Sequence, residues 1–201
     1  KVTVDVKALG VDMVSLSAHK LGGPQGIGAL AMPCDGLELT PLIGGGGQER
    51  GRRAGTENVP GIVGFGVAAR DAAVGLDHLA LWRDTLEKKA QAVRPACRIL
   101  GAGAPRLPNT SCLALPGLSG EVLVMALDLA GVAVSAGSAC SSGKVAPSHV
   151  LKVMGHAALA GAAIRISLGW NSRAGDVDRF IEAWSAVAAR AARDRSAASA
   201  A

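Results

Sequence analysis

Two apolar, strand-like segments joined by a very short turn place the strongest constraint on the first third of this chain. Residues 11–16 and 26–32 both have the apolar character of buried strands. The Gly22-Gly23-Pro24 turn between them is too short for the crossover helix that a parallel pair needs. We therefore predict that the two strands are antiparallel.

Lys20 stands where the first of these strands meets the turn. Ligands of α/β proteins bind at the carboxyl ends of strands. A lysine buried against such an edge can lose its proton and bond covalently to an aldehyde cofactor. An ordinary surface lysine fits the same position, so Lys20 by itself leaves both interpretations open.

The remaining sequence predicts alternating helices and short strands. We expect strands near 98–101, 110–115, 132–134 and 164–168, and helices near 57–73, 76–93, 120–130, 147–151 and 176–193. Thr56 is the expected N-cap of the first helix, and Pro147 is expected in the first turn of the fourth. The pattern divides the chain into units at 1–75 and 76–195, with a disordered tail at 196–201.

Charge and composition argue against nucleic acid and membrane partners. The net charge is +5, but the chain has few of the aromatic side chains on which bases stack. A local explanation fits better, because Arg50, Arg52 and Arg53 form a cluster suited to a phosphate-bearing ligand or a partner subunit. No run approaches the roughly 20 apolar residues of a membrane-spanning helix, and no signal peptide is visible.

The four cysteines differ in their surroundings. None of them has the short spacing of a zinc site or a redox dithiol, so reduced thiols and a cytoplasmic location are expected. Cys97 and Cys112 lie in apolar runs and are predicted to be core residues, whereas Cys34 is assigned no role. Cys140 lies in a loop of small polar residues, where Lys144 could favour the thiolate, and is the candidate reactive thiol.

Three separated motifs resemble those of one enzyme family. Ser17-Ala18-His19-Lys20, the segment Arg50–Thr56 and Gly137-Ser138-Ala139-Cys140 are similar, in the same order, to motifs of the cysteine desulfurases. These are class-V aminotransferase relatives that use pyridoxal phosphate to remove sulfur from cysteine. The resemblance implies an α/β fold of the fold type I pyridoxal-phosphate-dependent transferases. Residues 1–75 would be part of the large cofactor domain, and residues 76–195 the small α+β domain.

The resemblance also implies roles for the first two motifs. Lys20 would hold pyridoxal phosphate and move the Cα proton of the substrate. Ser17 and His19 would contact the cofactor phosphate, and on a strand these two side chains would share a face. Thr56 would hydrogen-bond the phosphate held by a neighbouring subunit, which implies a homodimer; the simpler interpretation is an N-cap only.

Cys140 and Arg165 would act on the substrate. By resemblance, Cys140 attacks the sulfur of L-cysteine and becomes a persulfide, leaving alanine, and it is also a possible iron–sulfur ligand through that persulfide. Arg165 matches the arginine that binds the substrate carboxylate; a solvent-facing arginine at a sheet edge is the alternative. The implied partner is an iron–sulfur scaffold or another sulfur-acceptor protein.

Relatives of this kind are about twice as long, with most of the cofactor domain upstream of the lysine. This chain looks like the C-terminal half, and alone it is expected to bind pyridoxal phosphate weakly and to turn over little cysteine. Three alternatives to a desulfurase stay open: an inactive fragment, a carrier of persulfide or of a cluster, and an aminotransferase of the same fold.

Overall fold

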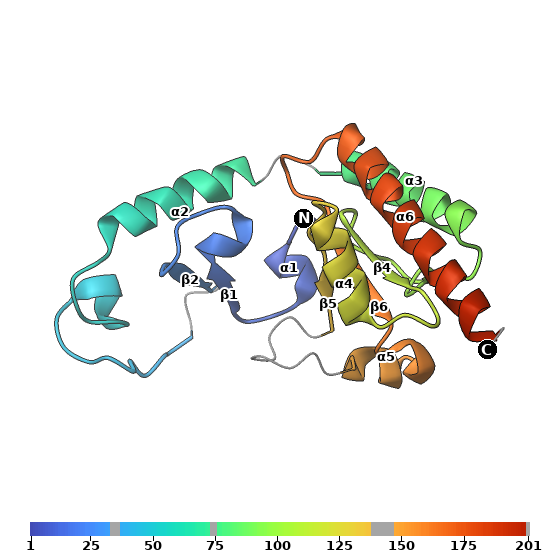
Figure 1. Cartoon of the computed structure of the whole chain (residues 1–201). Helices are drawn as coiled ribbons and strands as arrows, with labels where there is room; N and C mark the ends of the chain where they lie inside the picture. Colours follow the sequence, from blue (N-terminus) through green and yellow to red (C-terminus); the bar gives the residue numbers. More distant parts are fainter. Residues whose placement is uncertain (33–36, 73–75, 138–146, 200–201) are drawn as a thin grey trace. The chain divides into compact units, whose positions relative to one another are not determined.

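The computed structural model describes residues 1–32, 37–72, 76–137 and 147–199. The chain divides into two compact units, residues 1–75 and 76–201. Each unit has its own sheet and helices (Figure 1).

The first unit is built on an antiparallel ribbon, as predicted. Strand β1 (Val14–Ser17) pairs with β2 (Gly28–Ala31), with Val14 opposite Ala31 and Ser17 opposite Gly28. A 3₁₀ turn, η1 (Ala18–Leu21), follows β1 directly. The short helix α1 (Val6–Leu9), the turn η2 (Gln48–Gly51) and the helix α2 (Val59–Asp71) complete the unit.

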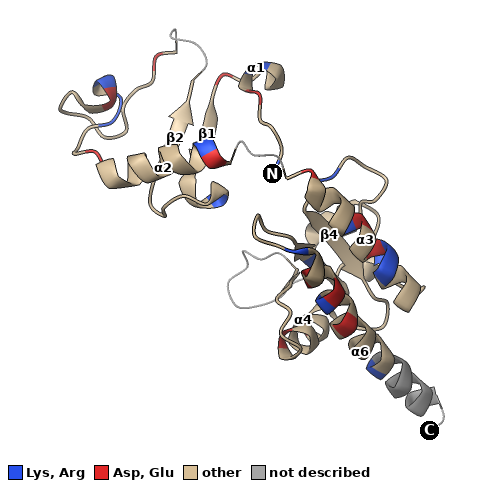
Figure 2. Cartoon of the chain, turned by 90° about the horizontal axis from the view of Figure 1, so that it is seen from above, with Lys and Arg blue, Asp and Glu red and all other residues tan. Residues whose placement is uncertain are grey.

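This unit buries very little apolar surface. Among its described residues, Ala18 is the only hydrophobic side chain that is fully buried. Helix α2 carries no charge until Arg70 and Asp71 at its end (Figure 2), yet Val59, Ile62 and Val63 on it are exposed. Neighbouring exposed apolar side chains of this kind normally contact another protein segment.

The second unit has a complete core on one face of a four-stranded sheet. The strands are β3 (Arg98–Ile99), β4 (Thr110–Ala114), β5 (Ser135–Ala136) and β6 (Ala163–Ser167), in the order β3-β4-β6-β5 and all antiparallel. Helices α3 (His78–Val93), α4 (Gly120–Leu129) and α6 (Ala174–Ser199) supply the covering layer. Leu113, Ile164 and Ile166 of the sheet pack there against Trp184 and its neighbours.

The opposite face of this sheet is only partly covered. Helix α5 (His149–Val153) and the turn η3 (Ala157–Leu159) lie over one end of it, where Leu151 and Ala160 pack with Ala114 and Ala163. Since side chains alternate along a strand, Cys112 and Arg165 share this second face, and Cys112 packs against the same cluster.

A largely buried ion pair connects α3 to the segment between β3 and β4. Arg106 donates to both carboxylate oxygens of Glu87, at 2.6 and 3.1 Å, and the Ser111 hydroxyl donates to Glu87 Oε1 at 2.6 Å. Hydrogen bonding to Glu87 is the largest of the effects that raise the pKa of Arg106. The network satisfies a carboxylate that is almost fully buried.

Several predicted boundaries were wrong. Helix α2 begins at Val59 with Asn58 as its N-cap, whose Oδ1 accepts from Gly61 N at 3.1 Å, so Thr56 is not the cap. Ser148 caps α5 and Pro147 precedes it. The strand expected at 132–134 lies instead at Ser135–Ala136, where β6 offers a pairing edge.

The C-terminal helix is longer than expected. Helix α6 continues to Ser199, into the segment 196–201 that the sequence predicts to be a disordered tail. Alanine has the highest intrinsic helix propensity, and the alanine-rich sequence there explains the extension.

Candidate active site

Lys20 lies on a turn whose backbone is held at both ends. The amide of Ala18 donates to the carbonyl of Ile27 at 3.1 Å, and the amide of Gly23 donates to the carbonyl of Ala18 at 2.9 Å. Gly22 closes the turn with a φ of 93°, a conformation that favours glycine. The Lys20 side chain is exposed, and no carboxylate among the described residues forms an ion pair with it.

Ser17 precedes this turn and His19 lies within it, an arrangement that differs from the prediction. The strand ends at Ser17, and His19 belongs to η1, so the prediction that both lie on one strand face was wrong. Glycine at 22 and 23 allows the chain to turn immediately after β1, which ends the extended conformation early. Ser17 is half-buried, whereas His19 and Lys20 are exposed.

The chemistry of this donor set fits pyridoxal phosphate. The cofactor needs an amine for its aldehyde and hydrogen-bond donors for its phosphate, and Lys20, Ser17 and His19 supply these within four residues. The Lys20 amine is accessible to the cofactor, and the fully buried Ala18 anchors the start of the turn. The first unit therefore has the groups to hold the cofactor covalently.

The segment that carries Thr56 is a strained, arginine-rich loop. Glu49 and Arg50 have φ values of 50° and 57°, which non-glycine residues rarely adopt. Arg53 Nη1 donates to the carbonyl of Gly55 at 2.8 Å, which braces the loop just before Thr56. Thr56 is exposed, and among the described residues no hydrogen bond joins it to the Lys20 turn.

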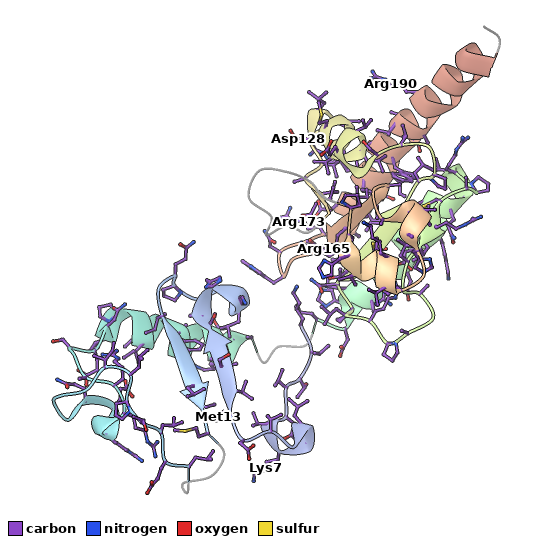
Figure 3. The ribbon with its side chains drawn as sticks, turned by 90° about the horizontal axis from the view of Figure 1, so that it is seen from below. Lys7, Met13, Asp128, Arg165, Arg173 and Arg190 are labelled. Atoms are coloured by element: carbon purple, nitrogen blue, oxygen red, sulfur yellow. The ribbon has the colours of Figure 1, made fainter. Side chains whose placement is uncertain are left out.

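Arg165 lies in the second unit, on the open face of the sheet (Figure 3). Its cross-strand partners are Cys112 on β4 and Ser135 on β5. Ile164 and Ile166 on either side of it are buried, whereas Arg165 is exposed. No acidic group among the described residues forms an ion pair with its guanidinium, so its charge is available to an anion.

The sequence did not identify the neighbours of Arg165. Cys112, predicted to be a core residue, is only half-buried, whereas Cys97 is fully buried as predicted. Burial raises the pKa of the Cys112 thiol, and the charge of Arg165 partly opposes that rise. The signal that could have found this pair is strand register, which the sequence alone does not fix.

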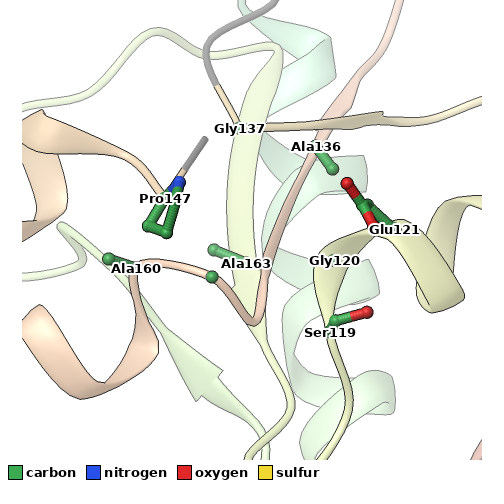
Figure 4. Close-up of a pocket in the computed structure, with 9 residues that line it drawn as sticks. Ser119, Gly120, Glu121, Ala136, Gly137, Pro147, Ala160 and Ala163 are labelled. Atoms are coloured by element: carbon green, nitrogen blue, oxygen red, sulfur yellow. The ribbon is translucent and has the colours of Figure 1, made fainter. Parts of the chain in front are cut away.

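Cys140 lies outside the described residues, as does Cys34. Gly137 and Pro147, the described residues on either side of the Cys140 segment, both line a pocket of about 260 Å³ at the start of α4 (Figure 4). Its other lining residues include Ser119, Glu121 and Ala163. In the described part of the chain, no cluster of His, Cys, Asp and Glu side chains could hold a metal ion.

Known proteins match nearly the whole chain. The family described as "Aminotransferase class-V" matches residues 1–180. The chain is 50% identical over 185 residues to a protein named "Cysteine desulfurase" from Cereibacter sphaeroides; the match covers 90% of this chain and 47% of that protein. The chain thus spans about half the length of the curated relatives it matches.

Solved structures agree in fold. A NifS-like protein from Rickettsia africae superposes with a TM-score of 0.78 at 35% identity, over 92% of this chain and 50% of that one. A structure titled "SspA in complex with cysteine" matches with a TM-score of 0.61 at 34% identity, over 82% of this chain and 46% of that one.

No helix in the described ranges is both long and apolar enough to cross a membrane.

Proposed function

The chain belongs to the class-V aminotransferase family, and we propose that it is part of a cysteine desulfurase that supplies sulfur for iron–sulfur cluster assembly. Its fold is that of the fold type I pyridoxal-phosphate enzymes, which confirms the predicted family and fold class. The family depends on pyridoxal phosphate, the cofactor predicted from the sequence. The observation that carries the proposal is the exposed Lys20 on its hydrogen-bonded turn.

In this proposal the side chains of the first unit hold the cofactor. The amine of Lys20 bonds to its aldehyde, while the Ser17 hydroxyl and the His19 imidazole donate to its phosphate. When bound, pyridoxal phosphate supplies an electron sink for bond breaking at the amino acid. The amino group of L-cysteine would take the place of the Lys20 amine on the aldehyde, and the released Lys20 amine would then act as the base that takes the Cα proton and later returns a proton.

The side chains of the second unit act on L-cysteine. Arg165 binds the substrate carboxylate through its planar, two-pronged guanidinium. The thiolate of Cys140 attacks the substrate sulfur, so that an S–S bond forms and the Cβ–S bond breaks. The electron pair of that bond is left on Cβ, which takes up a proton to give alanine, and Cys140 keeps the sulfur as a persulfide. A sulfur-acceptor protein would remove it.

The exposed Thr56 supports a homodimer with shared sites. On its braced loop, its hydroxyl is free to donate to a phosphate in a second subunit, and the nearby arginines add positive charge. A two-fold dimer would use this segment twice. Sedimentation of an active enzyme as a monomer would contradict this arrangement.

A cytoplasmic location is also proposed, on the cysteine pattern alone.

The test uses the completed enzyme, by which we mean this chain joined to the upstream half of its Cereibacter sphaeroides relative. Replacement of Cys140 by Ser should abolish alanine formation from cysteine and leave bound cofactor, seen by its visible absorbance, unchanged. An aminotransferase of the same fold would need no loop thiol. Alanine formation that survives C140S would therefore overturn the desulfurase proposal.

A further inference from the structure

Helix α2 approaches the turn after Lys20 so closely that one position has no room for a side chain. A Cβ atom added to Gly64 would lie 2.6 Å from Pro24 Cγ and 3.0 Å from Pro24 Cδ. The proline ring is rigid, so a residue larger than glycine would force the helix and the turn apart.

A second contact extends this packing to the buried residue of the turn. A Cβ added to Gly23 would lie 3.0 Å from Ala18 Cβ and 3.2 Å from Ala68 Cβ of α2. Ala18 is the first residue of η1 and has no exposed surface. Helix α2 therefore packs on the turn through Gly64 and Ala68.

The neighbouring glycine of the same helix shows that this packing is local. A Cβ added to Gly66 would meet no atom within 4 Å. Glycine inside a helix generally costs stability relative to alanine. At Gly66 no close contact requires glycine, whereas at Gly64 the absence of a side chain allows Pro24 to pack against the helix.

The contact between Gly64 and Pro24 is linked through the backbone to the turn that carries Lys20. Pro24 follows Gly23, whose amide donates to the Ala18 carbonyl and so closes the turn in which Lys20 lies. A shift of Pro24 must therefore move this hydrogen bond and the backbone of Lys20 with it. An amine that bonds covalently to a bound aldehyde tolerates only small displacements.

We propose that Gly64 is a positioning residue that acts through Pro24 to hold the Lys20 amine where the cofactor aldehyde is captured. The inference rests on the proposed role of Lys20. It assigns α2, which carries no cofactor-binding side chain in our proposal, a part in shaping the site.

The test measures capture of the cofactor rather than turnover. The completed enzyme, with or without the substitutions below, is incubated with pyridoxal phosphate and reduced with borohydride, and modified lysines are mapped by mass spectrometry. Labelling of Lys20 is divided by that of Lys88, an exposed lysine on α3. The variants are G64A, the matched control G66A, P24A, and the double variant P24A/G64A, in which the obstructing ring is gone.

The ratio should fall about tenfold in G64A and stay unchanged in G66A. Removing the ring should restore it, so the double variant should label like P24A alone. A loss that comes from a general effect of alanine on α2, and not from the contact with Pro24, would not be rescued by removing the proline ring. If G64A does not fold, the comparison of P24A/G64A with P24A still decides: equal labelling supports the proposal, and loss in the double variant overturns it.

Two further outcomes separate this inference from the proposed function. If Lys20 is preferred over Lys88 in the wild type and equally preferred in G64A, the inference about Gly64 is wrong and the role of Lys20 stands. If the wild type shows no preference for Lys20, both are overturned.

Discussion

Cys112 lies directly opposite Arg165 across the β4–β6 pairing, with Ser135 opposite on the other side. Directly opposed residues in antiparallel strands share a face, with their Cβ atoms about 5 Å apart. Both neighbours are uncharged at neutral pH, and burial favours the protonated thiol of Cys112 by raising its pKa. The positive charge of Arg165 is therefore not compensated within this row.

A carboxylate at position 112 should compete with the substrate for Arg165. In the completed enzyme, C112D is expected to raise KM for cysteine about tenfold with little change in kcat, because it pairs with the arginine before substrate binds. C112N has the same size without the charge and should leave KM within about twofold of the wild type. Equal KM values for the two variants would show that Arg165 does not bind the substrate carboxylate.

The buried Glu87–Arg106 pair should contribute far more stability than the exposed one beside it. R106M would leave the Glu87 carboxylate with only the Ser111 hydroxyl and should lower the free energy of unfolding by about 3 kcal/mol. The control is K89M, which removes a 2.6 Å ion pair with Asp178 whose side chains are 47% and 62% exposed. It should cost less than about 0.5 kcal/mol. Equal losses in urea denaturation would contradict this reading.

The buried thiol of Cys97 should make the second unit less stable in alkali. Burial, opposed by the charge of Arg98, raises the pKa of Cys97 from 9.0 to about 11. The folded state thus holds the proton more tightly than the unfolded state. The protonated thiol therefore contributes to the free energy of unfolding in full below pH 9, and this contribution is lost as the pH rises through 11.

Unfolding measured between pH 8 and pH 11 should show a loss of about 2 kcal/mol that C97A lacks. Cys112 contributes with the same sign, so C112A is the matched control and should remove only its own part. A pH dependence that C97A leaves unchanged would show that this thiol does not titrate in the folded protein.

The sequence predicted the family and the fold class better than the local geometry. The antiparallel ribbon followed from the short turn at 22–24, and Arg165 could be placed on a strand from its isoleucine neighbours. The N-cap was wrong because Thr56 and Asn58 are both suitable residues, and only the backbone path decides between them. Cross-strand neighbours such as Cys112 depend on register, and the Gly64–Pro24 contact depends on packing between segments 40 residues apart in sequence, which local patterns do not encode.

The first unit should need further protein to work. In the described part of the unit, no further strand pairs with either edge of the ribbon, and helix α2 exposes apolar residues. The chain alone should therefore bind pyridoxal phosphate weakly and associate nonspecifically. Addition of the upstream half of the Cereibacter sphaeroides relative, fused or as a separate polypeptide, should increase both the visible absorbance of bound cofactor and its retention on gel filtration. Strong absorbance and full solubility of the chain alone would contradict this expectation.

The central claim is that Cys140 takes the sulfur of cysteine while Lys20 holds the cofactor, and a single-turnover experiment on the completed enzyme tests it most directly. The enzyme is mixed with cysteine in the absence of an acceptor, alanine is quantified, and persulfide is mapped by mass spectrometry. We predict one alanine for each Cys140 that becomes a persulfide, and neither product in K20A or C140S. Alanine formed without modification of Cys140, or formed equally by K20A, would contradict the account.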